Sequence, residues 1–137
     1  VLVGAVADFD PALVISTSTD TEIEPAARAR GLRVATSFLA DRAYDDQGAL
    51  VSRKLPGAVV HDEQQVLQRV LQVLREGSIH SLSGRRRPMQ VQSILMHGDT
   101  PGAVALARLV RQAIVDSGGQ VLALSKLLAA PVAPAHT

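Results

Sequence analysis

A histidine and a carboxylate stand between a predicted strand and a predicted helix in the stretch SILMHGDTPGAVALARLV, residues 93–110. The imidazole of His97 can exchange a proton near neutral pH, and the Asp99 carboxylate could orient or charge that ring. Free backbone N–H groups at the start of the helix would also favour an anionic oxygen. The alternative is purely structural: Asp99 and Thr100 cap the helix, and Pro101 takes its first position.

A second group of polar residues follows another predicted strand, in the loop that begins with ADRAY. Asp41 supplies a carboxylate there, and Arg42 could hold a substrate carboxylate through two hydrogen bonds. Further along the chain, Arg53 and His61 could cover an anionic substrate. The alternative is a solvated loop with a local Asp–Arg surface pair, because most such pairs only face water.

Strand patterns and helix patterns alternate along the chain, which predicts an α/β fold with parallel strands and right-handed crossovers. Thr21 and Glu24 have the spacing of a capping box, and Gly31 and Gly77 are suited to ending two helices. Residues 1–8 fit a helix or a strand. We expect strands at 13–16, 32–39, 89–96 and 120–124, helices at 21–31, 62–77 and 102–117, and a flexible tail at 125–137.

The carboxyl ends of parallel strands meet at one edge of a sheet, where α/β folds bind their ligands. We therefore expect Asp41, Arg42, His97 and Asp99 to converge there. Four strands make either a small open sheet or half of a closed barrel, which usually needs about 250 residues. Half a barrel would leave bare strand edges for another segment or another chain to cover.

Composition narrows the class of protein. The 137 residues are 47% hydrophobic and 20% charged, which suits one folded domain spanning residues 1–137. The net charge of +1 argues against a dedicated nucleic-acid binder, and no apolar run approaches the ~20 residues that cross a bilayer. The chain has no cysteine, which suits a cytoplasmic protein, and it shows neither a metal-ligand motif nor a phosphate loop.

Three long motifs resemble one known family. They are TDTEIEPAARARGL at 19–32, LADRAYDDQGALVSRKLPGAVVHD at 39–62 and SILMHGDTPGAVALARLV at 93–110. In sequence and spacing they are similar to the LamB/YcsF family, also called the family of 5-oxoprolinase A-subunits. The likeness extends to about Leu124, and long motifs at matched spacing are more specific than the HGD tripeptide alone.

The resemblance implies a distorted (β/α)7 barrel of the glycoside hydrolase/deacetylase kind. It implies a component of an ATP-dependent 5-oxoprolinase, which opens the lactam of 5-oxo-L-proline to L-glutamate together with subunits B and C. ATP would be a co-substrate, with Mg²⁺ as its companion ion. Since the motifs of the family's N-terminal half are absent, we expect this chain to be the C-terminal half, inactive without the other.

The resemblance also implies roles for individual residues of this chain. It implies catalytic roles for His97, Asp99 and Asp41, and substrate-binding roles for Arg42, Arg53, His61 and Thr100. One departure matters, because Ser37 stands where the family usually has glutamate. That loss favours an alternative function, a non-catalytic half-barrel that binds an anion or serves as a scaffold for a partner chain.

Overall fold

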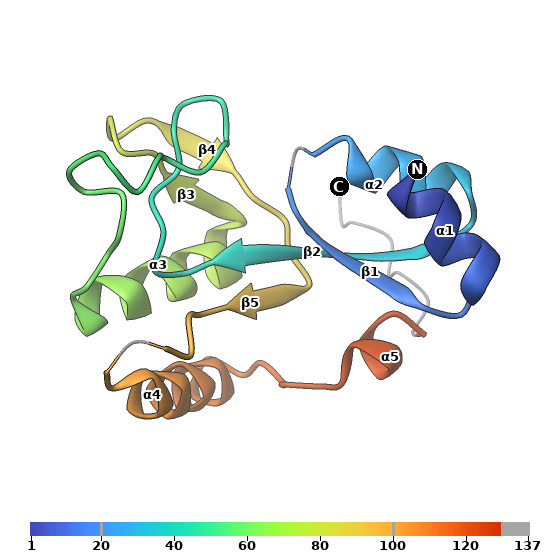
Figure 1. The fold of residues 1–137 in the computed structure, drawn as a ribbon. Coiled ribbons are helices and arrows are strands. Elements are labelled where there is room, and N and C mark those ends of the chain that lie inside the picture. The colour runs from blue at the N-terminus through green and yellow to red at the C-terminus, as the bar shows by residue number, and fades with distance from the viewer. Residues whose placement is uncertain (20, 100, 130–137) are drawn as a thin grey trace.

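A computed structural model describes residues 1–19, 21–99 and 101–129 of the chain. Figure 1 shows helices packed around a short sheet, with a separate hairpin beside it. In chain order the elements are α1 (Leu2–Phe9), β1 (Val14–Ser18), α2 (Ile23–Ala29), β2 (Arg33–Leu39), α3 (Glu63–Glu76), β3 (Ser78–His80), β4 (Arg86–Pro88), β5 (Ser93–Leu95), α4 (Ala103–Asp116) and α5 (Leu124–Leu127).

The central sheet is parallel, as the alternation of strands and helices predicts. Its strand order is β1-β2-β5, with β2 in the middle. Ser18 pairs with Ser37, and Leu39 pairs with Leu95. The pairing of β2 with β5 continues one residue further, since the Ala40 N–H donates to the Leu95 carbonyl at 3.1 Å. The loops that follow β2 and β5 therefore leave the sheet side by side.

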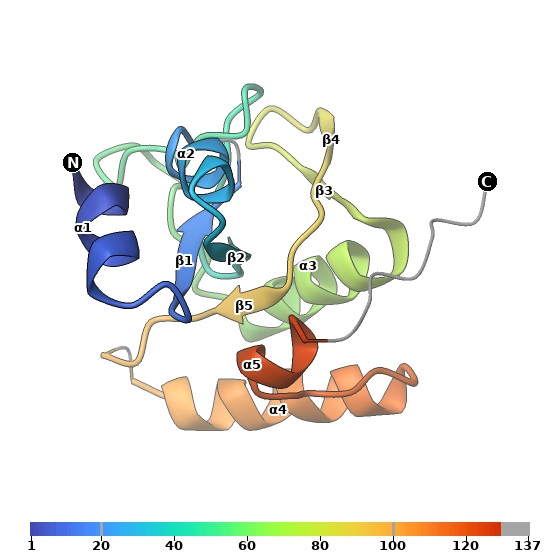
Figure 2. The ribbon, with the colours of Figure 1, turned by 90° about the vertical axis from the view of Figure 1, so that its right-hand side faces the viewer.

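Helices pack on the face of the sheet to which the even-numbered side chains of β2 point. Near the start of β2, Val34 belongs to a buried cluster with Ala27 of α2. Near its end, Phe38 belongs to a larger cluster with Val70 of α3 and Val110 of α4. Figure 1 shows α1 and α2 beside the start of β2 and α3 beside its end, while Figure 2 shows α4 running below β5.

The opposite face of the sheet carries small side chains, because the odd-numbered residues of β2 point there. Ser37 is buried on this face, and its hydroxyl is 2.9 Å from that of Ser16 on β1. On the neighbouring strand, Leu95 is 42% exposed. β1 and β5 are the edge strands of the three-stranded sheet. These are the strand edges that, from the sequence, we expect a further segment or chain to cover.

Two predicted helix boundaries are confirmed. Asp62 is the N-cap of α3, and its side chain accepts hydrogen bonds from the backbone N–H groups of Gln64 and Gln65. Gly77 ends the same helix with a φ of 58°. The loop between α2 and β2 likewise contains Gly31 with a φ of 74°. A side chain at either glycine would strain this left-handed backbone.

Two predicted helix starts are wrong. The Thr21 hydroxyl contacts Thr17 and the Ser18 carbonyl instead of forming a capping box, and the N-cap of α2 is Glu22 without a side-chain bond. Pro101 does not begin α4, which starts at Ala103 after Gly102. The predicted cap of α4, Thr100, lies outside the described residues.

Two predicted strands differ as well. The strand expected at 89–96 is confined to β5, and the residues just before the predicted range form β4, which pairs antiparallel with β3. No strand forms at 120–124 in the described chain, where irregular backbone leads into α5. Residues 1–8, left open between helix and strand, belong to α1 and its flank. Of the tail expected at 125–137, the first residues lie in α5, and residues 130–137 lie outside the described part.

None of the helices in the described ranges is both long enough and apolar enough to cross a membrane.

The end of β2 is held in place by an aromatic pair. The rings of Phe38 and Tyr44 stack with their centroids 5.9 Å apart, and both side chains are fully buried. The Tyr44 hydroxyl accepts the backbone N–H of Leu39 at 2.9 Å. Burial raises the pKa of Tyr44, because the charged phenolate is poorly solvated in the core. The loop after β2 is thus folded back onto the strand that precedes it.

We expect Tyr44→Phe to lower the free energy of unfolding by about 1–3 kcal/mol, because the buried Leu39 N–H would lose its acceptor. Urea unfolding measures this change. Phe9→Leu is the control, since that ring is 85% exposed and its replacement should cost less than about 0.5 kcal/mol. Equal effects of the two substitutions would contradict the contact.

Tyr44 should also give a pH dependence. Its folded pKa lies above the ordinary value of 10.0, so its contribution to stability is complete below pH 10 and is lost as the pH rises through the raised pKa. Tyr44 is the only tyrosine, so an absorbance titration of tyrosinate reports this residue alone. The titration midpoint should be higher for the folded chain than for the urea-unfolded chain, and identical midpoints would refute the assignment.

Candidate active site

The carboxyl ends of β2 and β5 bring Asp41 and His97 together. Each residue lies two positions beyond the end of its strand, and the paired strand ends, Leu39 and Leu95, set the two loops side by side. The Nδ1 atom of His97 is 2.5 Å from Oδ2 of Asp41, and the His97 backbone N–H donates to the same oxygen at 3.4 Å. The predicted convergence is confirmed for these two side chains.

Both members of this pair are largely shielded from water. The side chain of Asp41 is 12% exposed and that of His97 is 25% exposed. The second carboxylate oxygen of Asp41 is buried without a hydrogen-bond partner among the described residues. A carboxylate in such surroundings interacts strongly with its few polar neighbours, because water screens them little. Asp41 therefore fixes the orientation of the His97 ring.

Arg53 lies on the other side of the imidazole, with its Nη2 atom 2.7 Å from Nε2 of His97. A guanidinium has donors only, so Nε2 must accept this hydrogen bond and carries no proton. The proton of the neutral ring therefore sits on Nδ1 and is donated to Asp41. The three side chains define one tautomer, and the lone pair that could take up a proton faces an exposed cation.

Arg42 does not join this group. It is buried, and its guanidinium donates to the carbonyls of Val51 at 2.6 Å and Ala58 at 3.3 Å. Backbone bonds from Val51 to Ala43 and from Ala43 to Ala58 run beside these contacts. The loop expected from the sequence is thus built around Arg42, and this scaffold carries Arg53 toward His97.

The other predicted site residues lie apart from the Asp41–His97 pair or outside the described residues. Asp99 is exposed and, within the described ranges, makes neither a hydrogen bond nor an ion pair. The carboxylate that bonds Nδ1 of His97 is that of Asp41, not that of Asp99. His61 is exposed and lines a separate hollow of about 380 Å³ with Arg69 and Leu82. Thr100 is outside the described residues.

Sequence reasoning missed Arg69, which lies on α3 and contacts the backbone on both sides of Asp41. A signal was present in the sequence. Arg69 stands three residues after Val66 and four before Val73, so it shares the buried face of an amphipathic helix. A cation on such a face needs polar partners, and a helix pattern alone does not say which ones.

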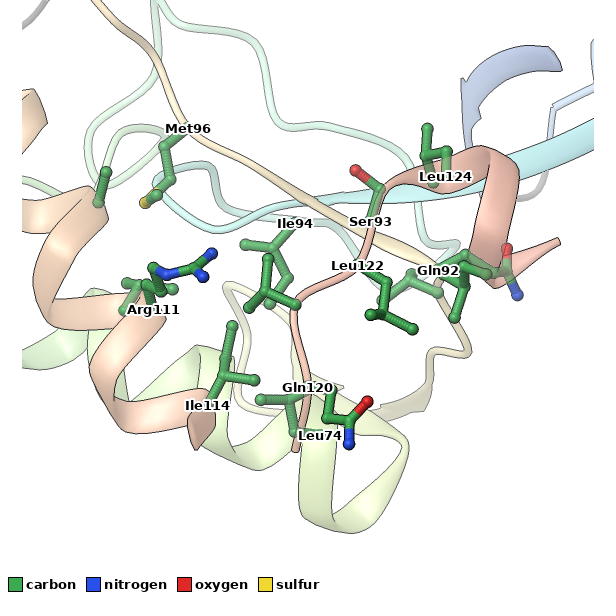
Figure 3. Close-up of a pocket in the computed structure, with 15 residues that line it drawn as sticks. Leu74, Gln92, Ser93, Ile94, Met96, Arg111, Ile114, Gln120, Leu122 and Leu124 are labelled. Atoms are coloured by element: carbon green, nitrogen blue, oxygen red, sulfur yellow. The ribbon is translucent and has the colours of Figure 1, made fainter. Parts of the chain in front are cut away.

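Two hollows lie near β5. One, of about 450 Å³, opens beside His97 between the end of β5 and the first turn of α4. The other, of about 300 Å³, lies between β5, α4 and the segment that leads into α5. Figure 3 shows the second hollow lined mainly by apolar side chains, among them Ile94, Ile114 and Leu122. The second hollow does not include His97, whereas His97 lines the first.

No group of three or more histidines and carboxylates in the described part of the chain is placed to hold a metal ion. The site brings together one carboxylate, one imidazole and one exposed guanidinium. Such a set can take up a proton at Nε2 and bind an anionic oxygen through Arg53.

Residues 1–129 match the model of the LamB/YcsF family. The chain belongs to the LamB/YcsF family. Its relatives include the second 5-oxoprolinase A-subunit of Ralstonia nicotianae, 57% identical over 133 residues, and the first 5-oxoprolinase A-subunit of Pseudomonas syringae pv. tomato, 55% identical over 127 residues. These alignments cover 97% and 93% of this chain but 51% and 50% of the relatives, so this LamB/YcsF chain spans about half their length.

The fold agrees with the family. The crystal structure of a lactam utilization protein from Thermus thermophilus superposes with a TM-score of 0.81 at 31% sequence identity. The superposition covers 90% of this LamB/YcsF chain and 49% of that protein. The alternating helices and parallel strands described above are thus shared with a protein of larger size.

We expect Arg42→Met to lower the free energy of unfolding by about 2–3 kcal/mol, because two carbonyls of the loop would lose a charged donor. Arg53→Met is the matched control. Arg53 is exposed, so its loss should change stability by less than about 0.5 kcal/mol. Urea unfolding of both variants tests the distinction, which fails if the two substitutions destabilise the chain equally.

Proposed function

We propose that this chain is one half of a 5-oxoprolinase A-subunit, in which it contributes to opening the lactam of 5-oxo-L-proline to L-glutamate. One observation carries the proposal, namely the placement of His97 between Asp41 at Nδ1 and Arg53 at Nε2. The relatives named as A-subunits of 5-oxoprolinase support the choice of reaction.

The proposal includes a larger assembly. The open edges of β1 and β5 and the half-length match fit one part of a (β/α)7 barrel, whose other half would come from an N-terminal segment or chain. The designation of the relatives as A-subunits is consistent with further subunits, for which we propose B and C. Closing the barrel would cover both edge strands and complete the walls around His97.

The reaction has a specific physical difficulty, because an unstrained lactam is stabilised by amide resonance. ATP, accompanied by Mg²⁺, would supply the activation by phosphorylating the lactam oxygen, which makes the ring carbon electrophilic. Water then adds to that carbon and the C–N bond breaks. The nitrogen would gain a proton to become an amino group, and a second water would hydrolyse the remaining acyl phosphate to the carboxylate of L-glutamate and free phosphate, with ADP as the other product.

In this scheme His97 is the general base. Its unprotonated Nε2 would take a proton from the attacking water, and the Nδ1–H···Asp41 bond would hold the ring and stabilise its charged form. Arg53 would turn from Nε2 to an anionic oxygen, either the substrate carboxylate or a phosphoryl group. Binding of the anion would thereby free the lone pair that the base needs.

A second candidate is a non-catalytic half-barrel that binds an anion or serves as a scaffold. Two observations favour it. Arg53 covers the lone pair of His97, and Ser37, where the resemblance places glutamate, is buried in a bond with Ser16. In this alternative the anion would bind at Arg53 and no lactam would be opened.

The decisive experiment assembles this chain with the N-terminal half and with subunits B and C, and measures glutamate release from 5-oxo-L-proline with ATP. We expect His97→Ala to lower kcat by about 10²–10⁴-fold, the usual contribution of a positioned general base. His80→Ala is the matched control, because His80 is exposed and its side chain is hydrogen-bonded only to that of Gln72 among the described residues.

Activity of His97→Ala above a tenth of the unsubstituted assembly would exclude His97 as the base. Calorimetry separates the scaffold alternative. If 5-oxo-L-proline binds and the assembly releases no glutamate, this half binds without catalysing.

A further inference from the structure

Arg69 donates hydrogen bonds to the backbone on both sides of Asp41. From α3, its Nε donates to the Ala40 carbonyl at 3.2 Å and its Nη2 donates to the Arg42 carbonyl at 2.6 Å. These two carbonyls belong to the residues immediately before and after Asp41. One rigid group therefore fixes the backbone from which the Asp41 carboxylate projects.

Packing holds the Arg69 guanidinium in this place. It is partly buried and lies over the ring of Phe38, with its central carbon 5.5 Å from the ring centroid. No ion pair to Arg69 forms within the described ranges. Burial lowers the pKa of Arg69, and the nearby Tyr44 and Asp41 groups act in the opposite direction. The cation is thus kept in the structure by backbone carbonyls and an aromatic face.

The geometry requires a guanidinium. Two N–H groups on one planar head reach two carbonyls that are two residues apart, whereas an ammonium is a single point of charge on a flexible stem. The carbonyl of Asp41 is also engaged, because it accepts the Val60 N–H at 2.9 Å. Successive carbonyls from Ala40 to Arg42 are therefore all held, and the Asp41 side chain has little freedom to leave His97.

We infer that Arg69 is a positioning residue for the Asp41–His97 pair: by holding the peptides around Asp41 it keeps the Asp41 carboxylate at Nδ1 of His97, which favours the Nδ1–H form of the ring together with Arg53 at Nε2. The consequence for catalysis rests on the proposed function. The effect on His97 does not, since it concerns only contacts within this chain.

The test is ¹⁵N NMR of the histidine side chains in the full chain at a pH where His97 is neutral. The ratio of the Nδ1–H form to the Nε2–H form of His97 is the measured quantity. We expect Arg69→Met to lower this ratio about tenfold, the size expected when one member of a shared hydrogen-bond network is removed. Arg69→Lys should lower it by a smaller factor, because one carbonyl can still be bonded.

Arg75→Met is the control on the same helix. Arg75 is exposed, and its side chain makes no hydrogen bond or ion pair in the described part of the chain, so its loss should leave the ratio unchanged. A second control compares the Asp41→Asn variant with the double variant Asp41→Asn, Arg69→Met. Because Arg69 acts through the Asp41 carboxylate, the additional substitution should then have no further effect on His97.

Several outcomes would overturn the inference. A folded Arg69→Met or Arg69→Lys chain with the original ratio would show that Asp41 is held without Arg69. An undiminished effect of Arg69→Met in the Asp41→Asn background would show that Arg69 reaches His97 by another route. Loss of cooperative unfolding in both Arg69 variants would assign Arg69 a general structural role instead.

The proposed function can fail separately. If the assembly with the N-terminal half and subunits B and C releases no glutamate, the proposed function falls, while a changed ratio in Arg69→Met still supports the positioning role. If the assembly is active, Arg69→Lys should lower kcat more than it changes KM. The reason is that Arg53, which would bind the anionic oxygen, is unchanged in this variant.

Discussion

The parallel pairing of β2 with β5 is the constraint on which the site depends. Because Leu39 pairs with Leu95, and the Ala40 N–H extends the pairing by one bond, the next residues of both strands leave the sheet at the same height. Asp41 and His97 are far apart in sequence, and this register sets them side by side, so that their side chains meet at 2.5 Å. A shift of one residue would turn one of the two toward the opposite face, since side chains alternate along a strand.

Arginines, rather than a rigid element of secondary structure, shape the loop that follows β2. Arg42 binds the loop from inside through the carbonyls of Val51 and Ala58, and Arg69 binds its first residues from α3. Charged donors to buried carbonyls make strong hydrogen bonds, so a loop with little regular structure can still hold a defined path. This path delivers Arg53 to the far side of the His97 ring.

The incomplete sheet connects this geometry to assembly. Hydrophobic packing is provided by α1 and α2 at one end of β2 and by α3 and α4 at the other, so the helical face of the sheet is already covered. The opposite face carries small polar side chains such as Ser16 and Ser37, and β1 and β5 are both edges. A second half that pairs with these edges would enclose the small-residue face and leave the loops of Asp41 and His97 at the rim.

The sequence by itself determined what depends on local preference: the alternation that makes a parallel α/β fold, the boundaries of α3 from Asp62 to Gly77, and the presence of polar residues after the strands. The predicted strand at 120–124 and the predicted capping box at Thr21 do not form. Short apolar runs and helix caps depend on what packs against them, which the local sequence does not specify. Only the tertiary structure decided the pairing of His97 with Asp41 and the inward turn of Arg42. Such pairings are set by strand register and burial, which bring distant residues together in ways that no local pattern records.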